Sequence, residues 1–186
     1  MARRRQAWFD GQPDLDPERL IFVDESAATT KMARLRGRAP RGERWRAAVP
    51  HGHWTTTTFV GALRLSGMTA PMVLDGPMNG PAFLADGQQG LAPTLKRGQT
   101  VIIDTLPAPK LAGVQAAIEA TGARLPPPDS PDFNPIERAF AKLKPVLRRA
   151  AARTIPELWT TIGNALPQFT PAECANYFTA CGYKPD

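Results

Sequence analysis

The fold of this chain is indicated most clearly by one octapeptide, Ser130-Pro131-Asp132-Phe133-Asn134-Pro135-Ile136-Glu137. Asn134 is a favoured N-cap residue, and Pro135 has the fixed φ that suits the first helical position. We therefore expect a helix that begins here and carries Glu137 in its first turn. The pattern also has a purely structural explanation, because a glutamate three residues after the cap can return to a backbone N–H and only start the helix.

Two short apolar runs upstream each lead into an aspartate. They are Leu20-Ile21-Phe22-Val23-Asp24 and Thr100-Val101-Ile102-Ile103-Asp104. Their length, composition and flanking turn residues predict buried strands over 20–25 and 100–105. Ligand sites in open α/β sheets lie at strand ends. Each aspartate alone is more commonly a turn or cap residue, so the candidate metal site depends on Asp24, Asp104 and Glu137 being taken together.

Further motifs along the chain accompany these acids. They are Phe22-Val23-Asp24-Glu25-Ser26, Gly37-Arg38-Ala39-Pro40-Arg41-Gly42, His51-Gly52-His53-Trp54, Asp75-Gly76-Pro77-Met78-Asn79-Gly80, Leu91-Ala92-Pro93-Thr94-Leu95 and Ile102-Ile103-Asp104. With them the chain resembles the catalytic domain of a mariner-superfamily transposase, in the bacterial insertion-sequence branch. The resemblance implies an RNase H-like fold and an Asp-Asp-Glu metal triad, carried here by Asp24, Asp104 and Glu137.

The implied cofactor is Mg²⁺, or Mn²⁺ in its place. Carboxylate oxygens are hard ligands that suit these ions, and two ions about 4 Å apart can stabilise both the attacking and the leaving oxygen in phosphoryl transfer. In this scheme Asp24 would contribute to holding both ions, while Asp104 and Glu137 would each hold one. The ions would supply the positive charge that lets water cut at the element end and the freed 3′-OH attack target DNA.

Three functions remain open at this stage. The first is a DNA transposase catalytic domain, a metal-dependent phosphoryl transferase that cleaves transposon ends and joins them to target DNA. The second is a non-catalytic DNA-binding or dimerising remnant of a transposase. The third is an RNase H-like nuclease that uses the same triad only for hydrolysis.

Positive charge is clustered along the chain. The 23 Lys and Arg exceed the 17 Asp and Glu by six charges, and the isoelectric point is about 9.8. Most charge runs are solvated faces, but arginine clusters beside a carboxylate site suit a phosphate backbone. The candidate DNA-binding residues are Arg34, Arg36, Arg38, Arg41, Lys110 and Lys142.

The expected partners follow from this function. They are double-stranded DNA, as transposon ends and target, and a second copy of the chain in a homodimer. Family transposases carry helix-turn-helix modules before the catalytic domain, whereas this chain has about 20 residues before Asp24. Sequence-specific binding of the element ends must then come from a separate helix-turn-helix polypeptide, from a frameshift product, or from neither. The chain has neither a run of about 18 apolar residues nor a secretory signal, so we expect a cytoplasmic protein with no membrane partner.

Histidine and cysteine contribute little to this hypothesis. Cys174 and Cys181 have no paired spacing that indicates a zinc site or a disulfide framework. His51 and His53 flank a glycine without further ligands nearby, so a turn or hydrogen-bonding role is favoured over metal binding. We assign catalysis to none of these residues.

The expected architecture is an α/β fold with a mixed sheet flanked by helices. An antiparallel meander is followed by a parallel crossover. Predicted strands cover 20–25, 44–50, 54–65, 68–75 and 100–105, with an extended piece at 123–126; predicted helices follow Asn79, cover 110–121, begin near Glu137, and cover 155–166 and 171–181. The predicted domains are a basic N-terminal extension (1–19), the RNase H-like catalytic domain (20–151) and a C-terminal helical extension packed on it (152–186).

Two more helix starts act as internal comparisons for Glu137. Thr154-Ile155-Pro156-Glu157 and Thr170-Pro171-Ala172-Glu173 have the same capping pattern with proline in the first turn. Neither follows a Ser-Pro-Asp sequence. We interpret both glutamates as structural.

Overall fold

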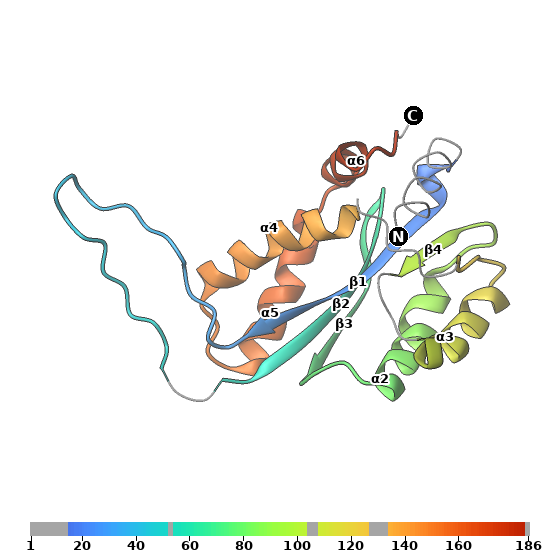
Figure 1. The fold of residues 1–186 in the computed structure, drawn as a ribbon, viewed down its shortest axis with the longest axis horizontal. Coiled ribbons are helices and arrows are strands. Elements are labelled where there is room, and N and C mark those ends of the chain that lie inside the picture. Colours follow the sequence, from blue (N-terminus) through green and yellow to red (C-terminus); the bar gives the residue numbers. More distant parts are fainter. Residues whose placement is uncertain (1–14, 52–53, 104–107, 127–133, 185–186) are drawn as a thin grey trace.

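A mixed sheet lies between two layers of helices in the computed structural model (Figure 1). The structure describes residues 15–51, 54–103, 108–126 and 134–184, with the side chains of 108–111 outside that description. The strands are β1 (Leu20–Thr29), β2 (Thr56–Arg64), β3 (Gly67–Asp75) and β4 (Thr100–Ile103). The main helices are α2 (Gly80–Ala85), α3 (Ala108–Ala120), α4 (Pro135–Ala150), α5 (Ile155–Ala165) and α6 (Pro171–Ala180), and a π-helical turn, η3 (Asp86–Leu91), follows α2.

The sheet confirms the expected topology. Its strand order is β3-β2-β1-β4. β1, β2 and β3 form an antiparallel meander. β4 pairs in parallel with the first half of β1, from Leu20 opposite Thr100 to Val23 opposite Ile103. This mixed sheet between helices is the RNase H-like α/β arrangement.

Alternation along β1 builds a separate core on each face of the sheet. Leu20, Phe22 and Ala28 belong to a buried cluster that includes side chains of α4, α5 and α6. Ile21 and Val23 belong to a second cluster, which includes residues of α2 and α3. Because successive strand residues point to opposite faces, the even-numbered positions of β1 face α4. We call this side of the sheet the α4 face.

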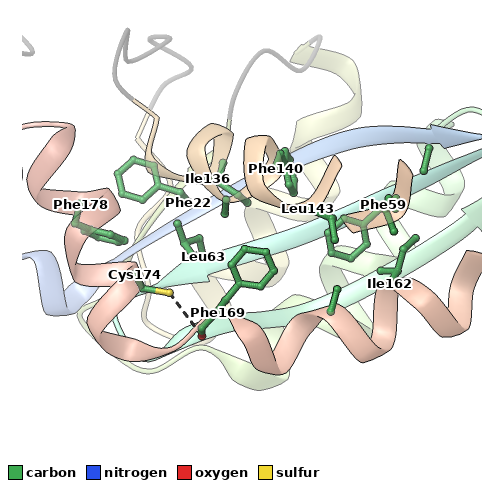
Figure 2. Close-up of a cluster of buried hydrophobic side chains, with 14 of the residues drawn as sticks. Phe22, Phe59, Leu63, Ile136, Phe140, Leu143, Ile162, Phe169, Cys174 and Phe178 are labelled. Carbon is green, nitrogen blue, oxygen red and sulfur yellow. Dashed lines mark hydrogen bonds between the residues drawn. The ribbon is translucent and has the colours of Figure 1, made fainter. Parts of the chain in front are cut away.

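The start of α4 forms as its sequence predicts. Asn134 has extended dihedral angles, and its side chain accepts a hydrogen bond from the N–H of Ile136. The apolar stripe of the helix is buried against β1, β2, α5 and α6 (Figure 2). Its members are Ile136, Phe140, Leu143 and Leu147, each at most 4% exposed. The helix continues through Pro145 to Ala150.

The predicted strand over 44–50 is wrong. The described residues between β1 and β2 form a long projecting loop without strand structure (Figure 1). We call residues 31–51 together with 54–55 the arm. Residues 34–49 are all exposed, so the apolar side chains of 44–49 have no core to cover. The Trp45 indole instead lies against Gly37, so closely that a side chain at that glycine would collide with it.

Two smaller differences concern strand lengths. β1 continues to Thr29 rather than ending near residue 25, because the segment from Ser26 to Thr29 pairs with β2. The extended piece at 123–126 is reduced to a single bridge between Arg124 and Thr100. Among the described helices, none is long and apolar enough to cross a bilayer.

Candidate active site

Asp24 lies in the middle of β1 rather than at its end. It is the fifth of the ten residues in the strand, and it pairs with Gly61 of β2. Its side chain is partly exposed, and one carboxylate oxygen accepts a hydrogen bond of 2.7 Å from the N–H of Glu25. As an even-numbered position of β1, Asp24 shares the α4 face with Phe22.

Asp104 lies outside the described residues. The residue before it, Ile103, is the last described residue of β4 and pairs with Val23. Asp24 and Asp104 thus each follow one member of the last described pair of the parallel ladder. The triad geometry that includes Asp104 stays a prediction.

Glu137 stands at the start of α4, one residue beyond the fully buried Ile136. Its side chain is exposed, and it makes no hydrogen bond or ion pair with a described residue. Ile136 packs in the same cluster as Phe22 of β1, which lies two residues before Asp24 on the same face. The fold therefore places Asp24 and Glu137 on one side of the sheet, through elements that pack on each other.

The other two N3 glutamates are fully engaged in structure. One Glu157 carboxylate oxygen accepts from the N–H groups of Arg153 and Thr154, which completes a capping box. Glu173 accepts hydrogen bonds from Lys142 Nζ at 2.5 Å and from the Tyr177 hydroxyl at 2.7 Å. These bonds lower the pKa of Glu157 and of Glu173. Both glutamates are structural, as predicted, and Glu137 differs from them in having no such partner among the described residues.

The end of α6 lies beside the start of α4. Arg138 donates a hydrogen bond of 3.3 Å to the carbonyl of Ala180. Burial raises the pKa of the neighbouring Cys181 thiol, and the negative charge of Glu137 raises it further, against an opposing effect of Arg138. Cys181 is thus a neutral, buried neighbour of the acid and not a thiolate nucleophile.

The predicted DNA-binding residues lie in three different settings. Arg34, Arg36, Arg38 and Arg41 lie on the arm and are exposed. Lys110 belongs to α3, and its side chain is outside the described residues. These assignments stay predictions.

Lys142 has several internal contacts. Its ammonium group binds Glu173 and the carbonyl of Gln168, and it lies 5.0 Å from the centre of the Phe169 ring. These contacts join α4 to α6 and to the turn before it. The structure therefore gives Lys142 a packing role, while its predicted contact with DNA stays a prediction.

The sequence prediction did not include two other basic residues of this helix. Lys144 and Arg148 of α4 share the face of Glu137, because their spacing of seven and eleven residues from it corresponds to whole turns of about 3.6 residues. The helical spacing from Glu137 is the signal that identifies them. Lys142, in contrast, lies on another side of the helix.

The donor chemistry of the site fits a hard divalent ion. In the described part of the chain, no group of three His, Cys, Asp or Glu residues is close enough to hold a metal ion, and one of the three predicted ligands lies outside that part. Asp24 and Glu137 supply carboxylate oxygens, which Mg²⁺ and Mn²⁺ prefer.

A family model described as DDE superfamily endonuclease matches residues 19–159. The chain belongs to this family. The matched DDE segment begins just before β1 and ends within α5, so it contains Asp24, Asp104 and Glu137. The curated proteins contain no sequence that matches the chain.

Solved structures of a mariner transposase share the fold of this DDE domain. The Mos1 strand transfer complex has a TM-score of 0.66 at 14% identity, covering 97% of this chain and 58% of that one. The Mos1 mariner paired end complex with Mn has a TM-score of 0.65 at 17% identity, covering 100% and 59%. The pre-cleavage Mos1 transpososome has a TM-score of 0.53 at 15% identity, covering 100% and 64%. This chain therefore spans about three fifths of the length of those proteins, and at such identities the likeness is one of fold.

Proposed function

We propose that this DDE domain is the catalytic part of a DNA transposase, which cleaves transposon ends and joins them to target DNA in a metal-dependent reaction. One observation carries the proposal. Glu137 has the same N3 position as Glu157 and Glu173, yet it alone extends from its helix without a hydrogen-bond partner among the described residues. It lies on the α4 face with Asp24, and the family match covers both.

In this proposal Asp24, Asp104 and Glu137 hold Mg²⁺ or Mn²⁺. When bound, the ions supply positive charge that stabilises the attacking and leaving oxygens of the phosphodiester. The chain's contribution is to hold the carboxylates in place. Asp24 is fixed in a strand paired on both sides, and Glu137 is fixed by the burial of the adjacent Ile136. The mariner paired end complex with Mn has the same fold.

The proposal includes partners and location. Double-stranded DNA is the substrate, and solved complexes of the same fold are a strand transfer complex and a pre-cleavage transpososome. A homodimer, a separate helix-turn-helix polypeptide and a cytoplasmic location belong to the same hypothesis.

The test is Mg²⁺- or Mn²⁺-dependent cleavage of a labelled duplex taken from the DNA that flanks the gene, assayed with a labelled target duplex. We expect the wild type to give cleaved ends and joined products, and Asp104→Ala and Glu137→Gln to give neither. Glu157→Gln is the matched control, since Glu157 occupies the same N3 position in another helix and should leave cleavage intact.

The other two functions are separate outcomes of this experiment. Cleaved ends without any joined product would favour a hydrolytic nuclease. Absence of cleavage together with absence of Mn²⁺ binding by calorimetry would favour a non-catalytic remnant and would contradict the proposal.

A further inference from the structure

A single stripe of α4 joins the candidate acid to a group of arginines. Glu137, Ala141, Lys144 and Arg148 follow one another at intervals of four, three and four residues, so they lie on the same face of the helix. The acid and the two basic residues are separated by the small side chain of Ala141. This face begins with a carboxylate at one end of the helix and becomes positively charged towards the other.

The stripe ends at a cleft of about 550 Å³ between α4 and the arm. We call it the basic cleft; it is lined by Arg34, Leu35, Arg36, Pro145, Arg148 and Arg149. No carboxylate is among these residues. Within the described parts of the chain, none of the four arginines has a hydrogen-bond or ion-pair partner.

Arg153 fixes the arm where it meets α4. Its guanidinium donates hydrogen bonds to the carbonyls of Thr30 and Met32, at 3.1 and 2.9 Å. The N–H of Thr30 also bonds to the carbonyl of Thr55 at the other side of the arm's base. The first residues of the arm are thereby tied to the connection that follows α4, which brings Arg34 and Arg36 to Arg148 and Arg149.

A preference for basic residues at helix ends explains only the two arginines that belong to α4. Basic residues are favourable in the last turn of a helix, where Arg148 and Arg149 lie. Arg34 and Arg36 come from the arm, so helix composition does not explain why they lie there. Guanidinium groups gathered without a counter-charge repel one another, and they suit an anion with several oxygen acceptors, such as a phosphodiester.

We propose that the basic cleft binds the phosphate backbone of the DNA duplex at a fixed distance from the cleaved bond, which rests on the proposed function of Glu137. At about 1.5 Å per residue, Arg148 lies about 16 Å along α4 from Glu137. With about 3.4 Å per base pair, this corresponds to a phosphate about five base pairs from the cut. The duplex then lies along the exposed face of α4, with Lys144 beneath it.

The first experiment measures the salt dependence of binding. A fluorescent 30-base-pair duplex is titrated in EDTA with the wild type, Arg148→Gln/Arg149→Gln and Arg34→Gln/Arg36→Gln. Each phosphate contact contributes about 0.9 to the slope of log affinity against log salt concentration. We expect each double variant to have a slope about 1.8 smaller than the wild type if both of its arginines contact phosphate.

The matched control is Arg97→Gln/Arg124→Gln. Both arginines are exposed, and they lie together near the start of β4, away from the basic cleft. This variant loses the same charge as the others, but its arginines lie outside the basic cleft, so it should change the slope by less than about 0.5. Circular dichroism and thermal melting verify that each variant is folded, and the arm variant provides the test if the α4 variant is not.

The second experiment maps the contacted phosphates by ethylation interference on the same duplex. We expect the wild type to show interference at a phosphate about five base pairs from the cleavage position, and both cleft variants to lose that signal. The proposal is overturned if the cleft variants keep the wild-type slope, if the control loses as much, or if the wild type binds no duplex. Binding through the basic cleft without any cleavage would instead contradict the proposed function, while the assignment of phosphate binding to the cleft would stand.

Discussion

Two glutamates at the same helical position should respond in opposite ways to replacement by alanine. Glu137 and Glu173 are both the third residue of a helix with an N-capping side chain before it. Glu173 binds Lys142 and Tyr177, with the Lys142 and Glu173 side chains only 31% and 29% exposed. Glu137 has no hydrogen-bond partner among the described residues. We expect Glu173→Ala to reduce stability and keep activity. We expect Glu137→Ala to keep stability and lose activity.

The size of the two effects follows from these contacts. A hydrogen bond to a charged group contributes about 1.5–3 kcal/mol, and partial exposure to solvent lowers this, so Glu173→Ala should reduce the free energy of unfolding by about 1–2 kcal/mol. For a chain of this size the melting temperature should fall by about 2–8 °C. Glu137 has no hydrogen-bond partner among the described residues, and its favourable interaction with the helix end is screened by salt. In 0.3 M salt Glu137→Ala should change stability by less than about 0.5 kcal/mol.

The assays are urea unfolding and metal-dependent cleavage of the labelled duplex at 25 °C. Glu137→Ala should lose cleavage to the background level, and Glu173→Ala should retain it. If Glu137→Ala instead destabilises the protein as much as Glu173→Ala does, Glu137 is a helix-start residue. If Glu137→Ala remains active, the proposed triad is wrong.

The pH dependence of stability gives an independent check on Glu173. Its hydrogen bonds with Lys142 and then with Tyr177 hold its pKa below the ordinary value of 4.5. A carboxylate whose pKa is lowered on folding stabilises the protein above its unfolded pKa, and this contribution disappears as the pH falls through the folded value. The difference in unfolding free energy between wild type and Glu173→Ala should therefore be largest at neutral pH and shrink below about pH 4.5.

Three other substitutions test the description of the fold. Burial raises the pKa of Asp86 in η3 to about 6 from 3.8, so the charged form destabilises the folded state. Asp86→Asn should therefore increase the unfolding free energy at pH 7 by up to about 3 kcal/mol. Urea unfolding should show that this gain disappears as the pH falls towards about 4. Pro145 is exposed inside α4. Pro145→Ala should increase the free energy of unfolding by up to about 3 kcal/mol and so raise the melting temperature. An unchanged melting temperature would mean that Pro145 does not strain the helix. Phe178 is fully buried, and the centre of its ring lies 5.4 Å from that of Phe22. Phe178→Ala should reduce the free energy of unfolding, measured with urea, by about 3–5 kcal/mol. A reduction below about 1 kcal/mol would contradict the packing of α6 on the sheet.

The parts of the fold that the sequence predicts are those with strong local signals. The buried strands appear where apolar and β-branched residues form continuous runs, and α4 begins where Asn134 and Pro135 favour a helix start. The segment 44–49 contains an aromatic and a β-branched residue, which strands favour, but a strand needs a partner and a core to cover. Both are tertiary conditions, and the exposed Trp45 packs on Gly37 instead.

The candidate site also has features that the sequence predicts and features that depend on tertiary packing. The residue types and order of the triad are visible in the sequence, and the register of Val23 with Ile103 supports bringing the two aspartates together. The position of Asp24 within its strand was not predicted, because the continuation of β1 depends on pairing with β2. Lys142 belongs to a basic run in the sequence, yet only the packing of α6 on α4 shows that Glu173 neutralises it.

The geometry of the proposed DNA path depends on α4 as one rigid element. The helix carries Glu137 at one end and Arg148 at the other, so the spacing between cleavage and phosphate binding is fixed by helical rise rather than by a loop. The arm could vary in position, but Arg153 ties its base to the same end of the helix. Loss of this tie in Arg153→Ala should therefore weaken DNA binding through Arg34 and Arg36 while leaving the contacts of Arg148 intact. The slope of log affinity against log salt concentration for Arg153→Ala should lie between those of the wild type and Arg34→Gln/Arg36→Gln. A slope smaller than that of Arg34→Gln/Arg36→Gln would show that Arg153 itself contacts the DNA.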